Sequence, residues 1–212
     1  MTRRDNTRGQ AFTLEGFVSS IVVLTAVLFA LQSFVLVPNT AGKLDDDTRA
    51  ELRREADDML VTSANAGERD LTYVVRYWDT SEQRFSGAVD RNVGYGTNPL
   101  PRQLFDGALY ESFDERGFTY NVIIRYRGDD ATDGSGRLPL VYQGPPADDA
   151  VTASHTTTLY DNMTLTAPGT GTRELREYDT DPTNNAGGFY PIPDADEGSP
   201  LYNVVEVRVI VW

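Results

Sequence analysis

The chain contains no cysteine among its 212 residues. Disulfides, thiolate metal sites and cysteine nucleophiles are therefore excluded. It also contains a single histidine, His155, which lies in a threonine-rich segment. Neither a histidine-based catalytic triad nor a two-histidine metal site can be built from one such side chain. We interpret His155 as a residue on the surface of a strand.

Lysine is almost absent as well, because Lys43 is the only one in a chain with 19 basic residues, 32 acidic residues and a net charge of -13. Surface carboxylates with almost no lysine are typical of halophilic proteins, which work in molar salt, where the Debye length falls to ~3 Å. The alternative is an ordinary acidic protein. In both cases the charge excludes nucleic-acid binding through counterion release, which requires clustered Lys and Arg.

One long segment has no charged side chain, the 22 residues from Gly16 to Val37. At ~1.5 Å per residue they give a helix of ~33 Å, enough to cross a hydrocarbon core of ~30 Å. We therefore predict a transmembrane helix over residues 10–37. A cleaved secretory signal is disfavoured, because the apolar segment is too long and the following "PNTAGKLDDD" has no convincing small-x-small cleavage site. A buried soluble helix is the other alternative.

The charges on the two sides of this segment predict its orientation. Three arginines precede it: Arg3, Arg4 and Arg8. Only Lys43 follows closely, beside three aspartates. By the positive-inside rule, residues 1–9 are a basic cytoplasmic leader and residues 44–212 are an extracellular domain of a single-pass protein of the cell membrane. Pro38 opens a linker or kink over residues 38–43, because proline lacks the N–H that a helix needs.

The leader and the start of the apolar segment, "RRDNTRGQAFTLEGF", resemble the class III signal of type IV prepilins, in particular archaeal type IV pilin-like proteins. In that family a short basic leader ends in glycine, a prepilin peptidase cuts on the cytoplasmic side, and the apolar helix is kept. The resemblance covers about residues 3–37. It implies a cut between Gly9 and Gln10, with Gln10 as the new N-terminus.

The same resemblance implies that the helix is an assembly element. Cut chains pack their apolar helices together in a filament core, with other pilin-like subunits as partners. Glu15, the sixth residue after Gly9, would pair there with the freed amino group of a neighbour, and dehydration of that pair would favour register-specific neighbours. In the bacterial pattern the glutamate is the fifth residue. The alternative is a plain anchor in contact with membrane lipid, in which Glu15 marks the interface.

Two amphipathic helices are expected in the body. In residues 44–64 the apolar side chains recur mostly at i, i+4, and aspartates in the first turn complement the helix macrodipole. Gly67 follows a suitable end. A second helix is expected over residues 101–115, stopped by Gly117. Residues 71–78, "LTYVVRYW", suit either a strand or a helix face, and both interpretations stay open.

Four segments have the alternation and the β-branched and aromatic content of strands: 118–127, 138–143, 151–160 and 201–212. In the last of them four valines face one side: Val205, Val207, Val209 and Val211. Residues 128–136 form a turn-rich loop, and residues 166–200 are predicted to be a long surface excursion. The fold class is α+β, with an N-terminal transmembrane helix followed by one or two amphipathic helices on a mostly antiparallel sheet of about four strands. Pilin bodies resemble this arrangement.

The body offers no recognisable catalytic constellation. No glycine-rich phosphate loop follows a strand and no paired carboxylates have an identifiable cleft, so we expect no enzyme, no catalytic residue, no cofactor and no metal. The segment "DDATDGSG" is not a calcium loop, because Ala131 and Leu140 stand where ligands are required. The sequon "NMT" makes Asn162 a candidate N-glycosylation site in a turn after a strand.

Together these features predict a membrane-anchored, type IV pilin-like surface protein. Because the C-terminal half is rich in loops, a role as a minor pilin or pseudopilin is favoured over that of a bulk subunit. The alternative is a monomeric anchored module that binds or senses an extracellular ligand. An exported enzyme is a third possibility, which would require a cleft lined by carboxylates.

Overall fold

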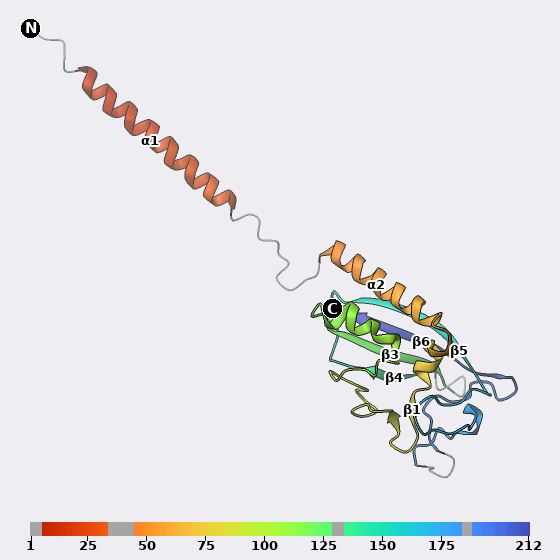
Figure 1. Ribbon diagram of the computed structural model, residues 1–212. Coiled ribbons are helices and arrows are strands. Elements are labelled where there is room, and N and C mark those ends of the chain that lie inside the picture. The colour runs from red at the N-terminus through yellow and green to blue at the C-terminus, as the bar shows by residue number, and fades with distance from the viewer. Residues whose placement is uncertain (1–5, 34–44, 129–133, 184–187) are drawn as a thin grey trace, which may run out of the picture. The chain divides into compact units, whose positions relative to one another are not determined.

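The computed structural model describes residues 6–33, 45–128, 134–183 and 188–212, apart from the side chains of residues 6–14, 29–33 and 106 (Figure 1). The chain divides into two units, Met1–Lys43 and Leu44–Trp212. The predicted linker over residues 38–43 lies outside the described residues, as do Arg3 and Arg4.

The described residues of the first unit form a helix, α1 (Asn6–Ser33). Its uncharged part within these bounds, residues 16–33, is about 27 Å long at ~1.5 Å per residue, which is short of a hydrocarbon core of ~30 Å. In the part of the chain that the structure describes, no helix is long and apolar enough to cross a membrane. The transmembrane helix predicted over residues 10–37 is therefore wrong as a description of the fold.

The second unit begins with α2 (Asp46–Ala64), which confirms the helix predicted over residues 44–64. Asp45 is its N-cap, and the Oδ1 of Asp45 accepts a hydrogen bond from the backbone N of Thr48 at 2.6 Å. Its buried side chains are mainly those of the predicted stripe: Leu52, Ala56, Met59, Leu60 and Ser63. This face joins the hydrophobic core, with α2 lying against β5 (Figure 1).

The core is built on a four-stranded antiparallel sheet in the order β4-β3-β6-β5 (Figure 1). Its strands are β3 (Tyr120–Arg127), β4 (Ser135–Val141), β5 (Val151–Tyr160) and β6 (Leu201–Val211). All four predicted strands are thus confirmed, with small shifts of their ends. The four valines predicted to face one side of the last strand are fully buried, at 0% exposure. The α+β class of the body is confirmed.

For the segment "LTYVVRYW" the sequence left both a helix and a strand open, and the structure contains one of each. It forms a short helix, α3 (Leu71–Val75), and then a strand, β1 (Trp78–Asp79). Strand β1 pairs with β2 (Arg84–Phe85) in a small second sheet that the sequence analysis did not predict. Such a two-residue strand is too short to show the alternation by which strands are recognised.

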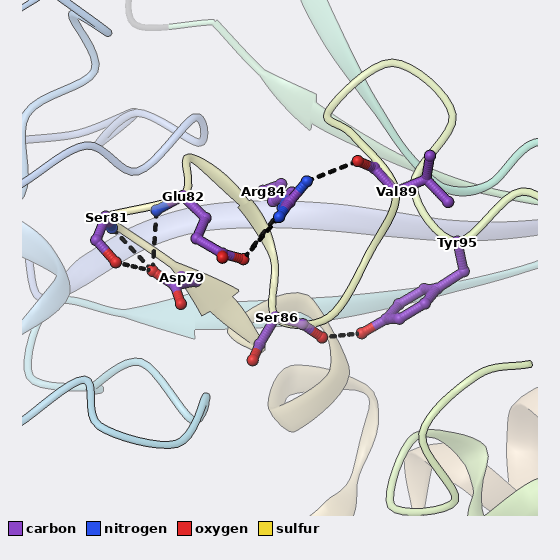
Figure 2. A network of polar contacts seen from close by, with 7 residues as sticks. All are labelled: Asp79, Ser81, Glu82, Arg84, Ser86, Val89 and Tyr95. Atoms are coloured by element: carbon purple, nitrogen blue, oxygen red, sulfur yellow. Dashed lines mark hydrogen bonds and ion pairs between the residues drawn. The ribbon is translucent and has the colours of Figure 1, made fainter. Parts of the chain in front are cut away.

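A carboxylate holds the turn between β1 and β2, as Figure 2 shows. The Oδ1 of Asp79 accepts hydrogen bonds from the backbone N and Oγ of Ser81, at 2.8 and 2.6 Å, and from the backbone N of Glu82 at 3.0 Å. The hydroxyl of Tyr95 donates to the carbonyl of Ser86 at 2.6 Å and fixes the loop that follows. The contacts of Asp79 form an Asx turn, in which the aspartate side chain takes the place of a backbone acceptor.

The helix predicted over residues 101–115 is wrong as a continuous element. The structure has a 3-10 turn, η2 (Phe105–Gly107), and a π-helical turn, η3 (Tyr110–Asp114). Phe105 and Gly107 have positive φ angles, 57° and 79°, which an α-helix does not allow. The ion pair between Arg116 and Glu55 connects the end of this segment to α2.

The predicted surface excursion, residues 166–200, is wrong in one respect, because part of it enters the core. It contains the short 3-10 helix η4 (Leu175–Glu177), and its buried side chains include Ala167, Leu175, Phe189, Tyr190 and Ile192. The Nε1 of Trp78 donates to the carbonyl of Phe189 at 2.9 Å, and the rings of Phe189 and Tyr190 approach Trp78 edge-on. Phe189 and Tyr190 of "FYPIP" thus pack against Trp78 in the core.

Candidate functional site

The apolar side chains of α1 are exposed within its own unit. They are Phe17, Val18, Ile21, Val22, Val23, Leu24, Val27 and Leu28. Val22, Val23 and Leu24 are successive residues and each is 62% exposed. Because successive helical residues point about 100° apart, these three face different sides. The helix is therefore apolar around its circumference rather than along one stripe, which is the pattern of a helix surrounded by other apolar elements.

Two of the three hydroxyl side chains in residues 16–28, those of Ser20 and Thr25, are turned back onto the helix backbone. The Oγ of Ser20 donates to the carbonyl of Gly16, and the Oγ1 of Thr25 donates to the carbonyl of Ile21, both at 2.7 Å. A hydroxyl bonded to the i-4 carbonyl needs no partner from outside the helix. Apolar neighbours can thus cover Ser20 and Thr25 without leaving either hydroxyl unsatisfied.

The predicted processing and pairing residues all belong to α1. Gly9 and Gln10 lie near its beginning, so the proposed cut falls in helical backbone, and Arg8 precedes them in the same helix. The side chains of these three residues are outside the described part. Glu15 is the first described side chain of the helix, and it is exposed. It lies where the polar start of α1 meets the apolar part, so a charged partner can reach it.

A second candidate surface lies on the main sheet, on the side away from the buried valines. Arg125 of β3 is in register with Arg137 of β4 and with Glu206 of β6. With Arg208 of β6 these arginines line a groove of about 480 Å³. Its apolar walls are Ile123, Ile210, Tyr142, Pro145 and Pro146. We call this the arginine groove.

The charges of the arginine groove are only partly compensated. Arg208 donates from Nη2 to both carboxylate oxygens of Glu206, at 3.1 and 3.0 Å. Partial burial raises the pKa of Glu206, but hydrogen bonds from Ser154 and Arg208 outweigh it and the pKa is lowered. Arg137 is exposed and has no hydrogen-bond or ion-pair partner among the described residues. The groove therefore carries an excess of positive charge in an acidic body.

A third surface collects negative charge at the opposite end of β6. A hollow of about 750 Å³ is lined by Asp161, Arg176 and Glu197, and an adjoining one of about 560 Å³ adds Glu177, Asp179 and Asp194. Burial and the neighbouring charge of Asp194 raise the pKa of Asp161. The Oδ1 of Asp161 is buried without a hydrogen-bond partner in the described part of the chain. We call this the acidic hollow.

Two predicted positions of the body remain, His155 and Asn162. His155 lies on β5, but it is half-buried and in register with the fully buried Val207 of β6. Partners in register share a face of the sheet, so His155 lies on the core-facing side and the predicted surface position is wrong. Asn162 is exposed in the turn after β5, where the sequon was expected, and it lines the acidic hollow. Within the described ranges no group of three or more His, Asp or Glu side chains could hold a metal ion.

Neither the arginine groove nor the acidic hollow was predicted from the sequence. The groove arginines lie in "IIRYRG", "SGRLPL" and "EVRVIV". Only in the last segment does burial alternate along the strand, with Arg208 between the buried Val207 and Val209, and there the alternation was a usable signal for the solvent face. The sequence does not show which strands are neighbours, so it could not reveal that the arginines meet.

Comparison with known proteins gives one match. Residues 8–211 match a protein family of unknown function, DUF7288, and the match covers α1 together with nearly all of the body. No curated protein matches the chain. No solved structure matches it either.

Proposed function

The chain belongs to the DUF7288 family of unknown function, and we propose that it is a type IV pilin-like surface subunit that assembles through α1. Its partners are a prepilin peptidase, which removes residues 1–9, and other pilin-like subunits, whose apolar helices surround α1. The body, residues 44–212, is carried on the outside of the assembly.

The exposure of α1 is the observation that supports this proposal most. Three successive residues, Val22, Val23 and Leu24, are exposed to the same extent, so contact along one side would leave the others in water. Each fully buried aliphatic side chain contributes about 1.5–3 kcal/mol relative to an exposed one. Several neighbouring helices are needed to bury the apolar side chains on all sides of α1, and a filament core provides such neighbours.

Glu15 can fix how neighbouring copies of α1 are positioned along one another in such an assembly. Cleavage after Gly9 frees the amino group of Gln10, a positive charge close to the polar end of the apolar helix. A carboxylate and an amino group from two chains attract one another strongly when apolar side chains exclude water around them. Glu15 is exposed and therefore available to a neighbouring chain.

The runner-up function is a monomeric surface module that binds an extracellular ligand. The arginine groove is the observation in its favour, because it provides charge and apolar walls together. This function needs neither cleavage after Gly9 nor contact between copies of α1.

The N-terminal residue of the full chain tests the proposal. The chain is expressed with and without its native prepilin peptidase, and the mature start is read by mass spectrometry. We expect Gln10 with the peptidase and Met1 or Thr2 without it. Gly9→Val should block cleavage, because the residue before the cut has to fit the peptidase. Gly16→Val is the matched control, since a Cβ at Gly16 meets nothing within 4 Å. A start at Met1 or Thr2 in both strains overturns the proposal.

A further inference from the structure

We propose that the arginines lining the arginine groove of one body pair with the carboxylates lining the acidic hollow of a second copy of this chain, so that the bodies associate head to tail. This inference rests on the proposed assembly, because packing of α1 would bring the bodies to a high effective concentration. It goes further by naming a contact between bodies and the residues that make it.

Charge complementarity identifies the partner. The chain has a net charge of -13, so most of its surface is acidic, yet Arg125, Arg137 and Arg208 meet in one groove. An arginine fork matches the geometry of a carboxylate and can bind it through two parallel hydrogen bonds. The acidic hollow offers Asp161, Asp194 and Glu197 with Arg176 as the one basic side chain of its lining.

Each of the two surfaces brings together like charges that repel one another in the free body. Arg125 and Arg137 are directly opposite on neighbouring strands, where like charges repel. In the acidic hollow, the carboxylate of Asp194 acts unfavourably on that of Asp161, and the smaller favourable effect of Arg176 does not cancel it. A contact between the two surfaces relieves both repulsions at once, whereas burial of either surface against apolar residues would leave its charges unpaired.

The apolar side chains that line the arginine groove would exclude water from the proposed contact. Ile123, Ile210 and Tyr142 surround the arginines, together with Pro145 and Pro146. Exclusion of water by such side chains strengthens the hydrogen bonds between arginine and carboxylate. The acidic hollow has Tyr160 and Pro200 at its edge as apolar counterparts.

The positions of the two surfaces favour a series of copies over a closed pair. Arg208 lies towards one end of β6, and Tyr202, which lines the acidic hollow, lies towards the other. At ~3.3 Å per residue the six intervening steps amount to ~20 Å. A contact between opposite ends leaves one groove and one hollow free, and a heterologous contact of this kind generates fibres when its rotation does not close a ring.

Disulfide trapping tests the contact directly, because the full chain has no cysteine of its own. One preparation carries Ser135→Cys in the groove, and a second carries Gly198→Cys in the acidic hollow. Both are made without N-glycans, since Asn162 lines the hollow. After mixing and mild oxidation we expect heterodimers in clear excess over the homodimers of either preparation. Heterodimers no more abundant than homodimers overturn the inference.

Charge reversal shows whether the trapped contact is the proposed one. Arg137→Glu on the groove chain, or Glu197→Arg on the hollow chain, should each lower the heterodimer yield about tenfold, and the two together should restore it. Arg102→Glu, an exposed arginine outside both surfaces, is the matched control and should leave the yield unchanged. A groove that binds free carboxylates instead gives yields that do not respond to Glu197→Arg, and this result overturns the inference.

A second crosslink separates this inference from the proposed function. A photo-crosslinking residue at Val22 reports packing of α1 in the same preparation. Crosslinks from Val22 without heterodimers through residues 135 and 198 overturn the contact between bodies and leave the pilin-like assembly standing. Heterodimers without crosslinks from Val22 overturn assembly through α1 and support the contact.

Discussion

Arg125 on β3 lies directly across from Arg137 on β4, paired in register between two antiparallel strands. Two like charges at such a position destabilise a sheet, and the remainder of the chain is strongly acidic. Arg125 is also in register with Glu206 of β6, but that carboxylate already accepts two hydrogen bonds from Arg208. The Nη2 of Arg125 donates to the Oγ of Ser135 at 3.1 Å, and this hydroxyl carries no charge. The repulsion between Arg125 and Arg137 therefore lowers the free energy of unfolding of the isolated body. The proposed contact with carboxylates would neutralise these charges.

Removing one charge of this pair should stabilise the free chain. Arg137→Gln keeps a long polar side chain and removes the repulsion from Arg125, so we expect the free energy of unfolding to rise by about 0.2–1 kcal/mol. Urea unfolding at low protein concentration measures it. Arg102→Gln, also exposed, is the control and should stay within error. A loss of stability specific to Arg137→Gln would show that Arg137 already has a compensating partner in the free chain.

Trp78 should be the most sensitive position of the core among the aromatic residues. Its side chain is 0% exposed, it contacts Phe85 and Phe189 edge-on, and its Nε1 donates to the carbonyl of Phe189. Trp78→Phe removes that hydrogen bond and leaves a cavity, so we expect a loss of about 2–4 kcal/mol in urea unfolding. Tyr110→Phe, at an exposed aromatic residue, should change stability by less than about 0.5 kcal/mol. Equal effects at the two positions would contradict this account of the core.

Gly94 should not tolerate a side chain. It has a φ of 60°, and a Cβ there would lie 2.0 Å from the carbonyl oxygen of Leu140 in the neighbouring strand β4. Gly94→Ala must therefore push these backbones apart, beyond the ~1 kcal/mol typical of a positive φ alone. Gly87→Ala is the matched control, because Gly87 has a φ of 78° and open space around it. Thermal unfolding should show the larger drop in Tm for Gly94→Ala, and similar drops would refute the close approach.

The Asx turn at Asp79 should make stability depend on pH. The Ser81 hydroxyl, with the backbone N–H groups of Ser81 and Glu82, lowers the pKa of Asp79 in the folded state. Its charge therefore stabilises the fold above the unfolded pKa of about 3.9, and this stability is lost as the pH falls through the folded pKa. Asp79→Asn should cost ~0.5 kcal/mol at pH 7, because the site is largely exposed. The cost should vanish near pH 2, and a cost that does not change with pH would contradict the assignment.

The parts of the fold that could be predicted are those with a repeating pattern. The buried stripe of α2 and the alternating valines of β6 each identify an element and its buried face from sequence alone. The parts that failed depend on single residues. Phe105 and Gly107 adopt positive φ angles and break the predicted helix, and Phe189 and Tyr190 enter the core from a segment whose composition is that of a loop.

The N-terminal segment shows a different limit. Its composition predicted a transmembrane helix over residues 10–37, and this was wrong, because in the described residues α1 is not long and apolar enough to cross a membrane. The candidate surfaces of the body were beyond prediction for a topological reason. Arg125 and Arg208 are far apart in the sequence and become neighbours because the last strand, β6, inserts beside β3.

The surroundings of α1 decide the central claim, and photo-crosslinking measures them. A benzophenone side chain is introduced singly at Val22, Val23 or Leu24 in the full chain, which is then irradiated in its native host after processing. If α1 packs against other subunits on all sides, each position gives ladders of chains crosslinked to copies of this chain or to other pilin-like subunits, identified by mass spectrometry. Monomers alone at all three positions, or crosslinks from one position and not from its neighbours, would contradict assembly through α1.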